Sequence, residues 1–511
     1  GSVPIVPTPH PYLLVVVRSS THPPGASLRG WVGDEAVLLL RTAESLHAVQ
    51  ATCPHYGAPL ADGAVHDGRI HCPWHHASFS LDDGAVCRPP ALDPLQTWPV
   101  EERDGWVRVR RGGPPPPGGG GGPPPPPDGG AGGGGGAAGT AAVLALREAG
   151  HRGDLLLIDP DAAAPYDRPN LSKDYLAGTA PEEWLPLRTG GDWAALDVER
   201  IVDRVVALDS RKTVLELGGG RRVPYDGLIL ACGAGPCRLA VPGGDRWNVF
   251  TLRSLDDSRA IRARAVAGSR AVVVGAGFIG LEAAAALRHR EVEVEVIAPE
   301  AVPMARVLGP TLGAEVRALH EAHGVRFHLG RRVSSIDDAG VHFADGGSVP
   351  ADFVVVGVGV EPRLDLALGA GLRVGDGVEV DRFLESSRRG VFVAGDLASF
   401  PDPATGDRLR IEHWAVAEAQ GRTAAFNLLG HGRPFRHVPF FWTTQYDVTV
   451  QWSGFPRPWD RTDVDGSLAE GSMAVRFLAS GNPVAAAFVD RDREGLRFEH
   501  DRAVELSGGA S

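Results

Sequence analysis

The stretch SRAVVVGAGFIGLEAAAAL, residues 269–287, decides the fold of most of this chain. A β-branched run ends at Gly275 and an Ala-rich segment follows Gly280, so the sequence predicts a buried strand, a tight turn and a helix. Gly275, Gly277 and Gly280 stand between them in the G-x-G-x-x-G spacing. Glycine permits the turn and lets a pyrophosphate group approach the N-terminus of the helix. The stretch therefore predicts a dinucleotide-binding unit.

A second copy of the pattern lies upstream, in GGGAAGTAAVLALR, with its glycines at Gly134, Gly136 and Gly139. The predicted strand DLLLID that follows ends on Asp159, twenty residues after Gly139. That is the spacing expected of the acid that binds a nucleotide ribose. Two such units predict two nucleotide cofactors, or one cofactor and one nucleotide substrate.

The first strand of the upstream copy is unusual. Where the downstream copy has AVVV before its first glycine, the upstream copy has GAGG at residues 130–133. Glycine in a strand costs roughly 0.5–1 kcal/mol relative to alanine and leaves nothing to pack. We therefore interpret this unit as a nucleotide site with a damaged first strand, not as a different fold.

The ribose-binding acid of the downstream unit is less clear. The predicted strand VEVEVIA ends at Ala298, where NADH-linked proteins usually carry an acid, and Glu300 lies two residues further on. An ungapped alignment of the two copies pairs Glu300 with Asp159, whereas a strand-by-strand alignment does not. The sequence inclines towards NADH and leaves NADPH open.

Residues 1–111 contain short apolar runs separated by turns, which predicts a small antiparallel β domain. Two segments, TCPHYGAPL and IHCPWHHASF, supply four candidate metal ligands: Cys53, His55, Cys72 and His75. This set could hold a zinc ion, or a Rieske [2Fe–2S] cluster with cysteines on one iron and histidines on the other. Each segment contributes one residue of each type, which favours the cluster. We expect the neighbouring His76 to lie at the surface.

The composition of the chain argues against several classes of function. The formal net charge of −12 argues against a general nucleic-acid binder, and no apolar run is long enough to span a bilayer. The five cysteines, two of them in the metal pattern, favour a reduced, cytoplasmic setting over a disulfide framework. Lysine occurs only at Lys173 and Lys212, so a lysine inside a motif is notable.

Four further stretches resemble the FAD-dependent ferredoxin reductases: APYDRPNLSKDYLAG (164–178), YDGLILACGAGPCRLAVPG (225–243), GVFVAGDLASF (390–400) and IEHWAVAEAQGRTAAFNLLG (411–430). With the Rieske pattern in front, the whole order is similar to the apoptosis-inducing-factor-like oxidoreductases. The resemblance implies an all-β Rieske domain, two Rossmann-like α/β domains for FAD and NAD(P), and a C-terminal α+β domain. Their predicted bounds are 1–111 for the Rieske domain, 112–127 for a Pro/Gly linker, 128–250 with 385–433 for the FAD domain, 251–384 for the NAD(P) domain and 434–511 for the last domain.

The resemblance also implies roles for single residues. Asp159 would bind the adenosine ribose of FAD, and the glycines of the upstream loop would face its pyrophosphate. Glu282 would lie near the nicotinamide. The remaining residues would lie along the FAD: Arg168 and Lys173 near the flavin and pyrophosphate, Asp396 at the ribityl chain or pyrophosphate, and Trp414 beside the isoalloxazine.

Some positions depart from related proteins. High-potential Rieske proteins carry a disulfide between the two ligand loops, and the matching residues here are Ala58 and Trp74. They also carry two hydroxyls that bind the cluster sulfurs, where this chain has Ala77 and Phe79. Fewer hydrogen bonds stabilise the reduced cluster less, so we predict a potential on the order of −150 mV.

The remaining cysteines do not form a recognisable redox site. Cys232 and Cys237, in CGAGPC, stand on the wrong loop for a disulfide reductase, and we expect buried, inert thiols. The sequence assigns no role to Cys87.

The sequence as a whole predicts an NAD(P)H oxidoreductase that passes electrons through FAD to a Rieske cluster and then to an acceptor. The acceptor is unidentified, a protein acceptor and a homodimer both stay open, and neither nucleic acid nor membrane is expected as a partner. Alternatives are a reductase that feeds an oxygenase or nitrite-reducing partner, a redox sensor that holds a slow NADH–flavin complex, and a degenerate protein with a cluster but no flavin.

Overall fold

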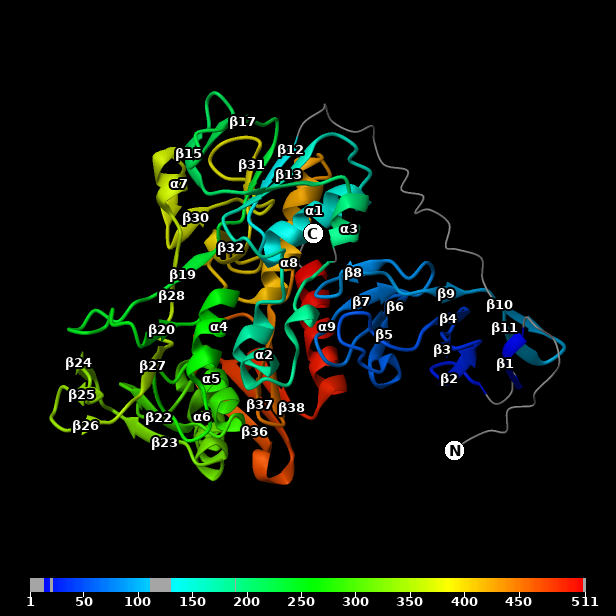
Figure 1. Ribbon diagram of the computed structural model, residues 1–511. Helices are drawn as coiled ribbons and strands as arrows, with labels where there is room; N and C mark the ends of the chain where they lie inside the picture. The colour runs from blue at the N-terminus through cyan, green and yellow to red at the C-terminus, as the bar shows by residue number, and fades with distance from the viewer. Residues whose placement is uncertain (1–12, 19–21, 111–129, 189, 509–511) are drawn as a thin grey trace. The chain divides into compact units, whose positions relative to one another are not determined.

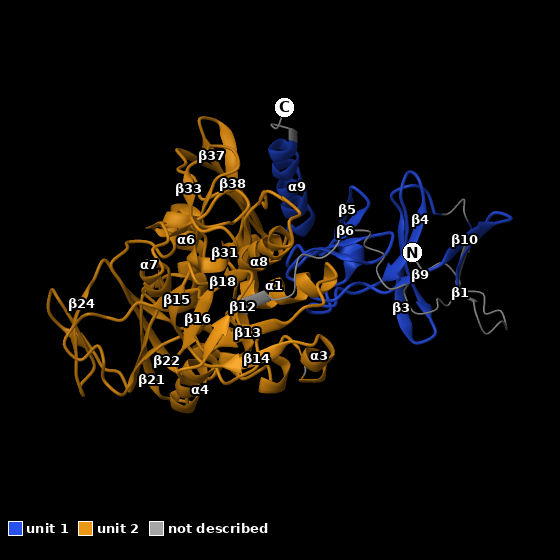
Figure 2. Cartoon of the chain, turned by 90° about the horizontal axis from the view of Figure 1, so that it is seen from above, with its two compact units in different colours: residues 1–124, 491–511 blue, residues 125–490 orange. Residues whose placement is uncertain are grey.

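The computed structural model describes residues 13–18, 22–110, 130–188 and 190–508 of the 511 (Figure 1). The chain divides into two compact units, residues 1–124 with 491–511, and residues 125–490 (Figure 2). The predicted linker at 112–127 lies outside the described residues. The multidomain fold class predicted above is confirmed, and we describe each unit by itself.

The first unit contains three antiparallel sheets and one long helix. The sheets are β1(Leu13–Arg18)-β11(Trp106–Arg110)-β10(Val100–Arg103), β2(Ser27–Val32)-β3(Glu35–Arg41)-β4(Leu46–Gln50)-β9(Thr97–Trp98), and β5(Ala64–His66)-β6(Arg69–His71)-β7(Ser78–Ser80)-β8(Val86–Arg88). The helix is α9 (Asp492–Gly508), which Figure 2 draws in the colour of this unit.

Strand β3 explains why this unit has two cores. Its side chains alternate across the sheet, as the pleat requires. Val37 and Leu39 pack in a core with Trp98, whereas Leu38 and Leu40 pack in the core that contains the two predicted cysteine ligands. One buried strand therefore supports both faces of the small domain.

The second unit holds two parallel sheets of five strands each. Their orders are β14(Glu199–Val202)-β13(Leu155–Asp159)-β12(Gly130–Gly133)-β18(Leu228–Leu230)-β31(Val391–Val393) and β20(Val249–Thr251)-β27(Phe353–Val356)-β21(Arg270–Val274)-β22(Glu293–Ala298)-β23(Arg326–Leu329). The helices of this unit are α1(Ala137–Glu148), α2(Asp174–Ala177), α3(Gly190–Ala195), α4(Leu255–Arg264), α5(Phe278–His289), α6(Ala305–Ala322), α7(Asp365–Gly369) and α8(Trp414–Leu428).

An antiparallel sheet ends this unit, in the order β34(Phe440–Gln445)-β35(Val448–Gly454)-β38(Asn482–Val489)-β37(Ser472–Ala479)-β36(Arg461–Ser467). Smaller sheets are β15(Val205–Asp209)-β16(Val214–Leu217)-β17(Arg222–Pro224), β19(Ala234–Pro236)-β28(Val360–Pro362), β24(Val333–Ile336)-β25(Val341–Phe343)-β26(Ser348–Val349) and β29(Val374–Gly375)-β30(Gly377–Glu379)-β32(Ala398–Pro401)-β33(Arg408–Leu409).

The Gly-rich strand β12 forms at the centre of the first parallel sheet. It pairs in parallel with β13 on one side and with β18 on the other. A strand ladder is made by backbone N–H and C=O groups, which glycine supplies as well as valine does. The GAGG stretch therefore keeps the strand pairing expected of this unit.

The two Gly-rich loops have the same backbone geometry. The first glycines, Gly134 and Gly275, have φ angles of +96° and +108°. Their N–H groups donate to Ile158 and Ile297 at 2.9 and 2.8 Å. This register pairs Asp159 with Ala298, so the strand-by-strand alignment is the one that the structure supports.

Candidate functional site

Two short loops carry the four predicted metal ligands, and both fold in the same way. In the first, the Cys53 N–H donates to Ala58 O at 2.8 Å and the Gly57 N–H donates to Cys53 O at 2.9 Å. In the second, the equivalent bonds run from Cys72 to Ala77 at 2.7 Å and from His76 to Cys72 at 3.2 Å. Each loop thus presents one cysteine and one histidine in a matching frame.

Across the two loops, the two histidines lie together and the two cysteines lie together. The Nδ1 atoms of His55 and His75 lie 3.2 Å apart, and the thiols of Cys53 and Cys72 contact each other. Within the described ranges, no group of three or more His, Cys, Asp or Glu side chains could hold one metal ion. A thiol pair beside an imidazole pair matches a two-iron cluster with two ligands on each iron.

Apolar side chains occupy the positions where high-potential Rieske proteins carry a disulfide and hydroxyl groups. Ala58, Ala77 and Phe79 are buried, and Trp74 is 42% exposed. The expectation that His76 lies at the surface is wrong, because its side chain is fully buried. A buried imidazole needs a partner, and that partner comes from a distant part of the chain, as described below.

At the upstream Gly-rich loop, the acid predicted to bind ribose lies beside the glycines. A Cβ on Gly134 would stand 2.4 Å from the carbonyl oxygen of Ala231, so the loop approaches the next strand as only glycine can. Asp159 accepts hydrogen bonds from the N–H groups of Gly135 and Asp161, the second at 2.7 Å. Its carboxylate faces a cavity lined by Gly135, Asp159, Asp161, Ala163, Ala164, Pro165, Tyr166, Arg168 and Arg200.

Charged groups from distant segments gather along this site. Burial lowers the pKa of Arg168, and Arg253 adds to the effect. Arg253 Nη2 donates to Asp396 Oδ2 at 2.7 Å, and Asp396 lies in a short 3-10 helix, Gly395–Leu397. The structure therefore brings Arg168 and Asp396 into one cluster and adds Arg253, which no sequence motif indicated.

Several buried polar atoms in this region lack a hydrogen-bond partner among the residues that the structure describes. They are Thr140 Oγ1, Arg168 Nε, Arg253 Nε, His413 Nδ1, Glu418 Oε2 and Gln420 Nε2. Buried polar groups are normally paired, so such a set beside a Gly-rich loop fits a polar ligand. The residues present thus fit an FAD molecule.

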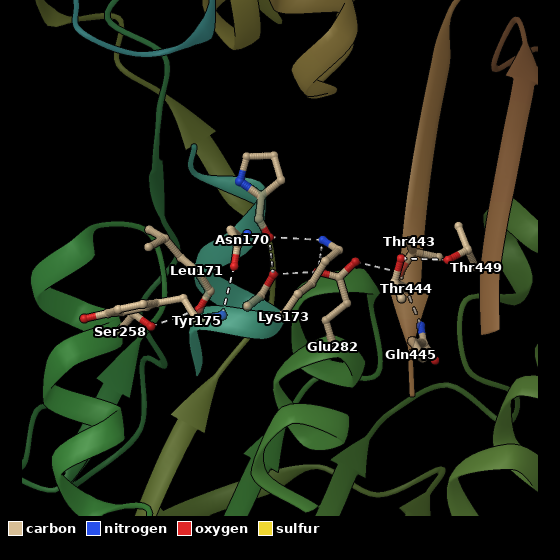
Figure 3. Close-up of polar contacts among 12 residues, drawn as sticks. Asn170, Leu171, Lys173, Tyr175, Ser258, Glu282, Thr443, Thr444, Gln445 and Thr449 are labelled. Carbon is tan, nitrogen blue, oxygen red and sulfur yellow. Dashed lines mark hydrogen bonds and ion pairs between the residues drawn. The ribbon is translucent and has the colours of Figure 1, made fainter. Parts of the chain in front are cut away.

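Lys173 and Glu282 meet in a buried ion pair, with 2.8 Å between Lys173 Nζ and Glu282 Oε2 (Figure 3). The same oxygen accepts from Ser172 Oγ at 2.6 Å, and Oε1 accepts from Thr443 Oγ1 at 2.6 Å. Glu282 is 3% exposed and lies on α5. One carboxylate therefore ties the 3-10 segment at Pro169–Ser172, helix α5 and strand β34 together.

The hydrogen bonds continue beyond Thr443 into a buried polar row. Gln445 Nε2 donates to Thr443 Oγ1 at 3.4 Å, and Gln445 Oε1 lies 2.7 Å from His320 Nε2. Burial lowers the pKa of His320 to about 4, so the imidazole is neutral and donates through Nε2. Because Thr443 accepts from Gln445, its hydroxyl donates to Glu282, so Glu282 acts as an acceptor. This agrees with a carboxylate paired with Lys173.

Trp414 is the first residue of α8, and it donates to a carboxyl group one turn further on. That group is Glu418, which is buried and whose pKa rises well above its usual range because of burial first and Asp167 second. Burial also raises the pKa of Asp167 to about 6. Sequence reasoning missed Glu418, although a single acid on the Ala-rich run AVAEAQG was a detectable signal.

The downstream loop repeats the close approaches of the upstream one. A Cβ on Gly275 would stand 2.3 Å from Gly357 O, and a Cβ on Gly280 would stand 2.2 Å from Gly275 O. Gly277 is the N-cap of α5. Glu300 lies two residues past the end of β22 and is exposed.

Cys232 and Cys237 are free thiols, but they are partly rather than fully buried. Burial raises the pKa of Cys232 to about 11 and also raises the pKa of Cys237. Thiols with raised pKa values are poor nucleophiles, so the expectation of unreactive groups agrees with their surroundings.

Comparison with known proteins agrees with this geometry. Residues 134–421 match the family model described as "Pyridine nucleotide-disulphide oxidoreductase". The chain belongs to this family. Residues 13–99 match the Rieske [2Fe–2S] domain, and residues 440–499 match the reductase C-terminal domain, whose match ends inside α9.

Individual relatives cover different shares of the chain. Apoptosis-inducing factor 3 from Homo sapiens is 31% identical over 90% of this chain and 79% of its own length. The 5,5'-dehydrodivanillate O-demethylase ferredoxin reductase subunit from Sphingobium sp. is 36% identical over 72% of this chain and 93% of its own. The crystal structure of the covalent putidaredoxin reductase–putidaredoxin complex gives a TM-score of 0.71 at 32% identity, over 74% of this chain and 93% of that chain.

These matches confirm the predicted activity class and cofactors. The protein is an NAD(P)H oxidoreductase of the ferredoxin-reductase type, with FAD as its flavin and a Rieske [2Fe–2S] domain. None of the described helices is both long and apolar enough to cross a membrane.

Proposed function

We propose that this protein takes electrons from NAD(P)H at the downstream Gly-rich loop and delivers them through FAD to its own Rieske cluster. The observation that carries the proposal is the presence, in one chain, of two matching Gly-rich loops and two matching ligand loops. An acceptor outside the chain then removes the electrons from the cluster.

In this proposal Cys53 and Cys72 hold one iron, and His55 and His75 hold the other. The two cysteines would supply thiolate ligands and the two histidines would supply imidazole ligands, which is the ligand set of a Rieske cluster. The absence of hydroxyl side chains at Ala77 and Phe79 supports a potential at the low end of the Rieske range, on the order of −150 mV.

For the nucleotides, Gly134, Gly136 and Gly139 admit the FAD pyrophosphate to the N-terminus of α1, and Asp159 binds its ribose. Gly275, Gly277 and Gly280 would do the same for NAD(P)H at α5, and Glu300, two residues after β22, is the candidate acid for its ribose. Bound FAD supplies the step from a two-electron donor to a one-electron acceptor.

The protein's own side chains position these groups. Arg168 and Asp396 would contact the pyrophosphate and ribityl parts of FAD, and Trp414 would lie beside its isoalloxazine ring. Lys173 would place a cation near the flavin, and Glu282 holds that cation through the ion pair at 2.8 Å.

A stopped-flow experiment tests the route. Under anaerobic conditions, NADH should bleach the flavin first and the cluster second, at separable wavelengths. In a Cys72→Ser variant the flavin should still bleach, and the second phase should be absent. A second phase that survives this substitution would show that the proposed ligands do not hold the cluster.

A second candidate function follows from the relatives. Several are reductase components named for oxygenase or demethylase systems. This chain would then feed such a partner, with its Rieske domain in the place of a separate ferredoxin. Product formation with a purified oxygenase terminal component and NADH tests it, and a Cys72→Ser chain that still supports turnover would rule out the fused domain as donor.

A further inference from the structure

Helix α9 packs against the small β domain. It begins at Asp492, after β38 ends at Val489, yet it belongs to the same compact unit as residues 1–124 (Figure 2). Residues spaced three and four apart, Arg493, Leu496, Glu499 and His500, form one face of this helix. Leu496 and Glu499 are buried on that face.

The buried carboxylate on this face reaches the second ligand loop. Oε2 of Glu499 lies 2.5 Å from Nδ1 of His76, the residue directly after the predicted ligand His75. Both side chains are almost fully buried, His76 completely and Glu499 to within 4%. The two residues are 423 positions apart in sequence.

The same carboxylate also pairs with Arg88, at the end of β8. Burial lowers the pKa of Arg88 to about 9, a cost that a carboxylate partner offsets. Strand β8 pairs with β7, which follows the second ligand loop directly. Glu499 therefore joins the loop to the strand that supports it.

The first ligand loop is held from the same helix. Arg493 donates from Nε to Asp62 O and from Nη2 to Ala61 O, each at 3.0 Å. These carbonyls belong to the 3-10 turn Leu60–Asp62, which follows the first ligand loop. Further along α9, the ring of His500 stacks on His66, with centroids 4.4 Å apart and planes at 15°.

The two ligand loops carry different residues at one equivalent position, and the residue in the second loop contacts α9. Gly57 and His76 occupy the same place in the two loops, with φ angles of +77° and +57°. Glycine adopts this conformation freely, whereas a histidine in it is disfavoured unless its surroundings hold it. Gly57 is exposed with nothing near its Cβ position, but His76 is buried against Glu499.

We propose that α9 holds the two ligand loops of the Rieske domain in position, and that Glu499 is a positioning residue for the second ligand loop. Through His76 and Arg88, Glu499 fixes the loop that presents Cys72 and His75, while Arg493 fixes the segment after the first loop. The proposal rests on the ligand set proposed above. It predicts that a change at the far end of the chain loosens the cluster.

The test uses the full-length protein with Glu499→Gln, and with Glu505→Gln as its matched control. Glu505 is an exposed carboxylate on the same helix, paired only at the surface with Arg502. We expect Glu499→Gln to release iron to a chelator on the order of tenfold faster or more, as changes to residues behind metal ligands do. The control should match the wild type, and flavin content should be equal in all three proteins.

Two further readouts separate positioning from general stability. The EPR spectrum of the reduced cluster should shift in Glu499→Gln at a temperature where circular dichroism shows the protein fully folded. His76→Gly gives the second loop the residue of the first and removes one of the two partners of Glu499. In that background Glu499→Gln should therefore increase iron release by a smaller factor than it does in the wild type. If the two substitutions act additively, Glu499 does not work through His76.

The outcomes distinguish this inference from the proposed function. A wild-type protein without two irons per chain would overturn the ligand set itself. A wild-type protein with two irons and a Glu499→Gln variant that releases them at the wild-type rate would overturn the role of α9 alone. Should Glu499→Gln fail to fold, Arg493→Gln, which alters the hydrogen bonds to Asp62 and Ala61, replaces it in the comparison. Faster iron release than in the wild type would support the role of α9, and release at the wild-type rate would overturn it.

Discussion

At the scale of single residues, the Lys173–Glu282 pair shows how much depends on one buried contact. Glu282 is surrounded by three donors, Lys173, Ser172 and Thr443, from two other segments. Breaking a buried pair by removing one partner is strongly destabilising, because it leaves an uncompensated charge. The resemblance to ferredoxin reductases implied a role for both residues, but their contact is visible only in the folded chain.

We expect Lys173→Met to lower the free energy of unfolding by about 3–5 kcal/mol and to slow flavin reduction by NADH. The chain offers its own control, because Lys212 is the only other lysine and its ion pair with Asp209 is at the surface. Lys212→Met should leave both properties unchanged. Denaturant unfolding and stopped-flow absorbance measure the two effects, and equal behaviour of the two variants would contradict the role given to Lys173.

A second residue-scale prediction concerns Glu418 and pH. Because its pKa is raised by burial, the folded protein keeps a proton that the unfolded chain releases above the usual value of about 4.3. The stability that this proton contributes is fully present below the pKa of Glu418 in the unfolded chain. It is lost as the pH rises through the pKa of Glu418 in the folded protein. We therefore expect Glu418→Gln to gain melting temperature relative to wild type as pH rises.

The measurement is thermal unfolding from about pH 5 to about pH 8, a range in which the effect should grow steadily. Glu412→Gln is the control, since Glu412 is an exposed acid on the same segment. A difference between Glu418→Gln and wild type that stays constant with pH would show that Glu418 is ionised in the folded protein.

At the scale of elements, the contact between α1 and α8 depends on a glycine. A Cβ at Gly421 would stand 2.0 Å from the carbonyl oxygen of Ala138, so the two helices touch through their backbones. This contact places Trp414 and Glu418, on α8, beside the Gly-rich loop that starts α1. We infer that the contact between these two helices sets the shape of the proposed FAD site.

We expect Gly421→Ala to lower stability by about 1–3 kcal/mol, the usual result of overpacking, and to lower the FAD content of the purified protein. Gly369→Ala is the matched control, because Gly369 ends helix α7 with no atom near its Cβ position. Flavin absorbance per chain and thermal unfolding report both effects. An unchanged flavin content in Gly421→Ala would mean that the helices can separate without disturbing the site.

The Gly-rich strand β12 belongs to the same scale. From the sequence we expected a damaged first strand, since glycine packs nothing. The strand forms all the same, between β13 and β18, because its hydrogen bonds use only the backbone. The low strand propensity of glycine therefore did not predict the outcome, because the two neighbouring strands provide hydrogen-bond partners for the backbone of β12.

At the scale of the whole molecule, the two nucleotide units and the Rieske domain predict a fixed cofactor content. We expect one FAD and two irons per chain in the purified protein, measured by flavin absorbance after denaturation and by iron analysis. Two irons without flavin, even after FAD is added, would show that the GAGG stretch has destroyed the upstream site. Flavin without iron would instead contradict the ligand loops.

By itself, the sequence determined the order of the parts. The paired G-x-G-x-x-G loops, the acid at Asp159 and the two Cys/His segments are local patterns, and each requires only a strand, a turn and a few neighbours. Because these patterns are local, the sequence did not decide whether Glu300 or Ala298 is the counterpart of Asp159. The backbone register of the two loops decided it. Expecting His76 at the surface failed for a related reason, because a histidine beside a ligand carries no sign of what covers it.

Only the tertiary structure decided which distant residues meet. Glu282 contacts Lys173 and Thr443, Arg253 contacts Asp396, and Glu499 contacts His76 across 423 positions. No spacing rule links such residues, since their proximity follows from how sheets and helices pack around a shared core. Burial then makes each contact obligatory, because a charge or an imidazole removed from water must find its partner inside the protein.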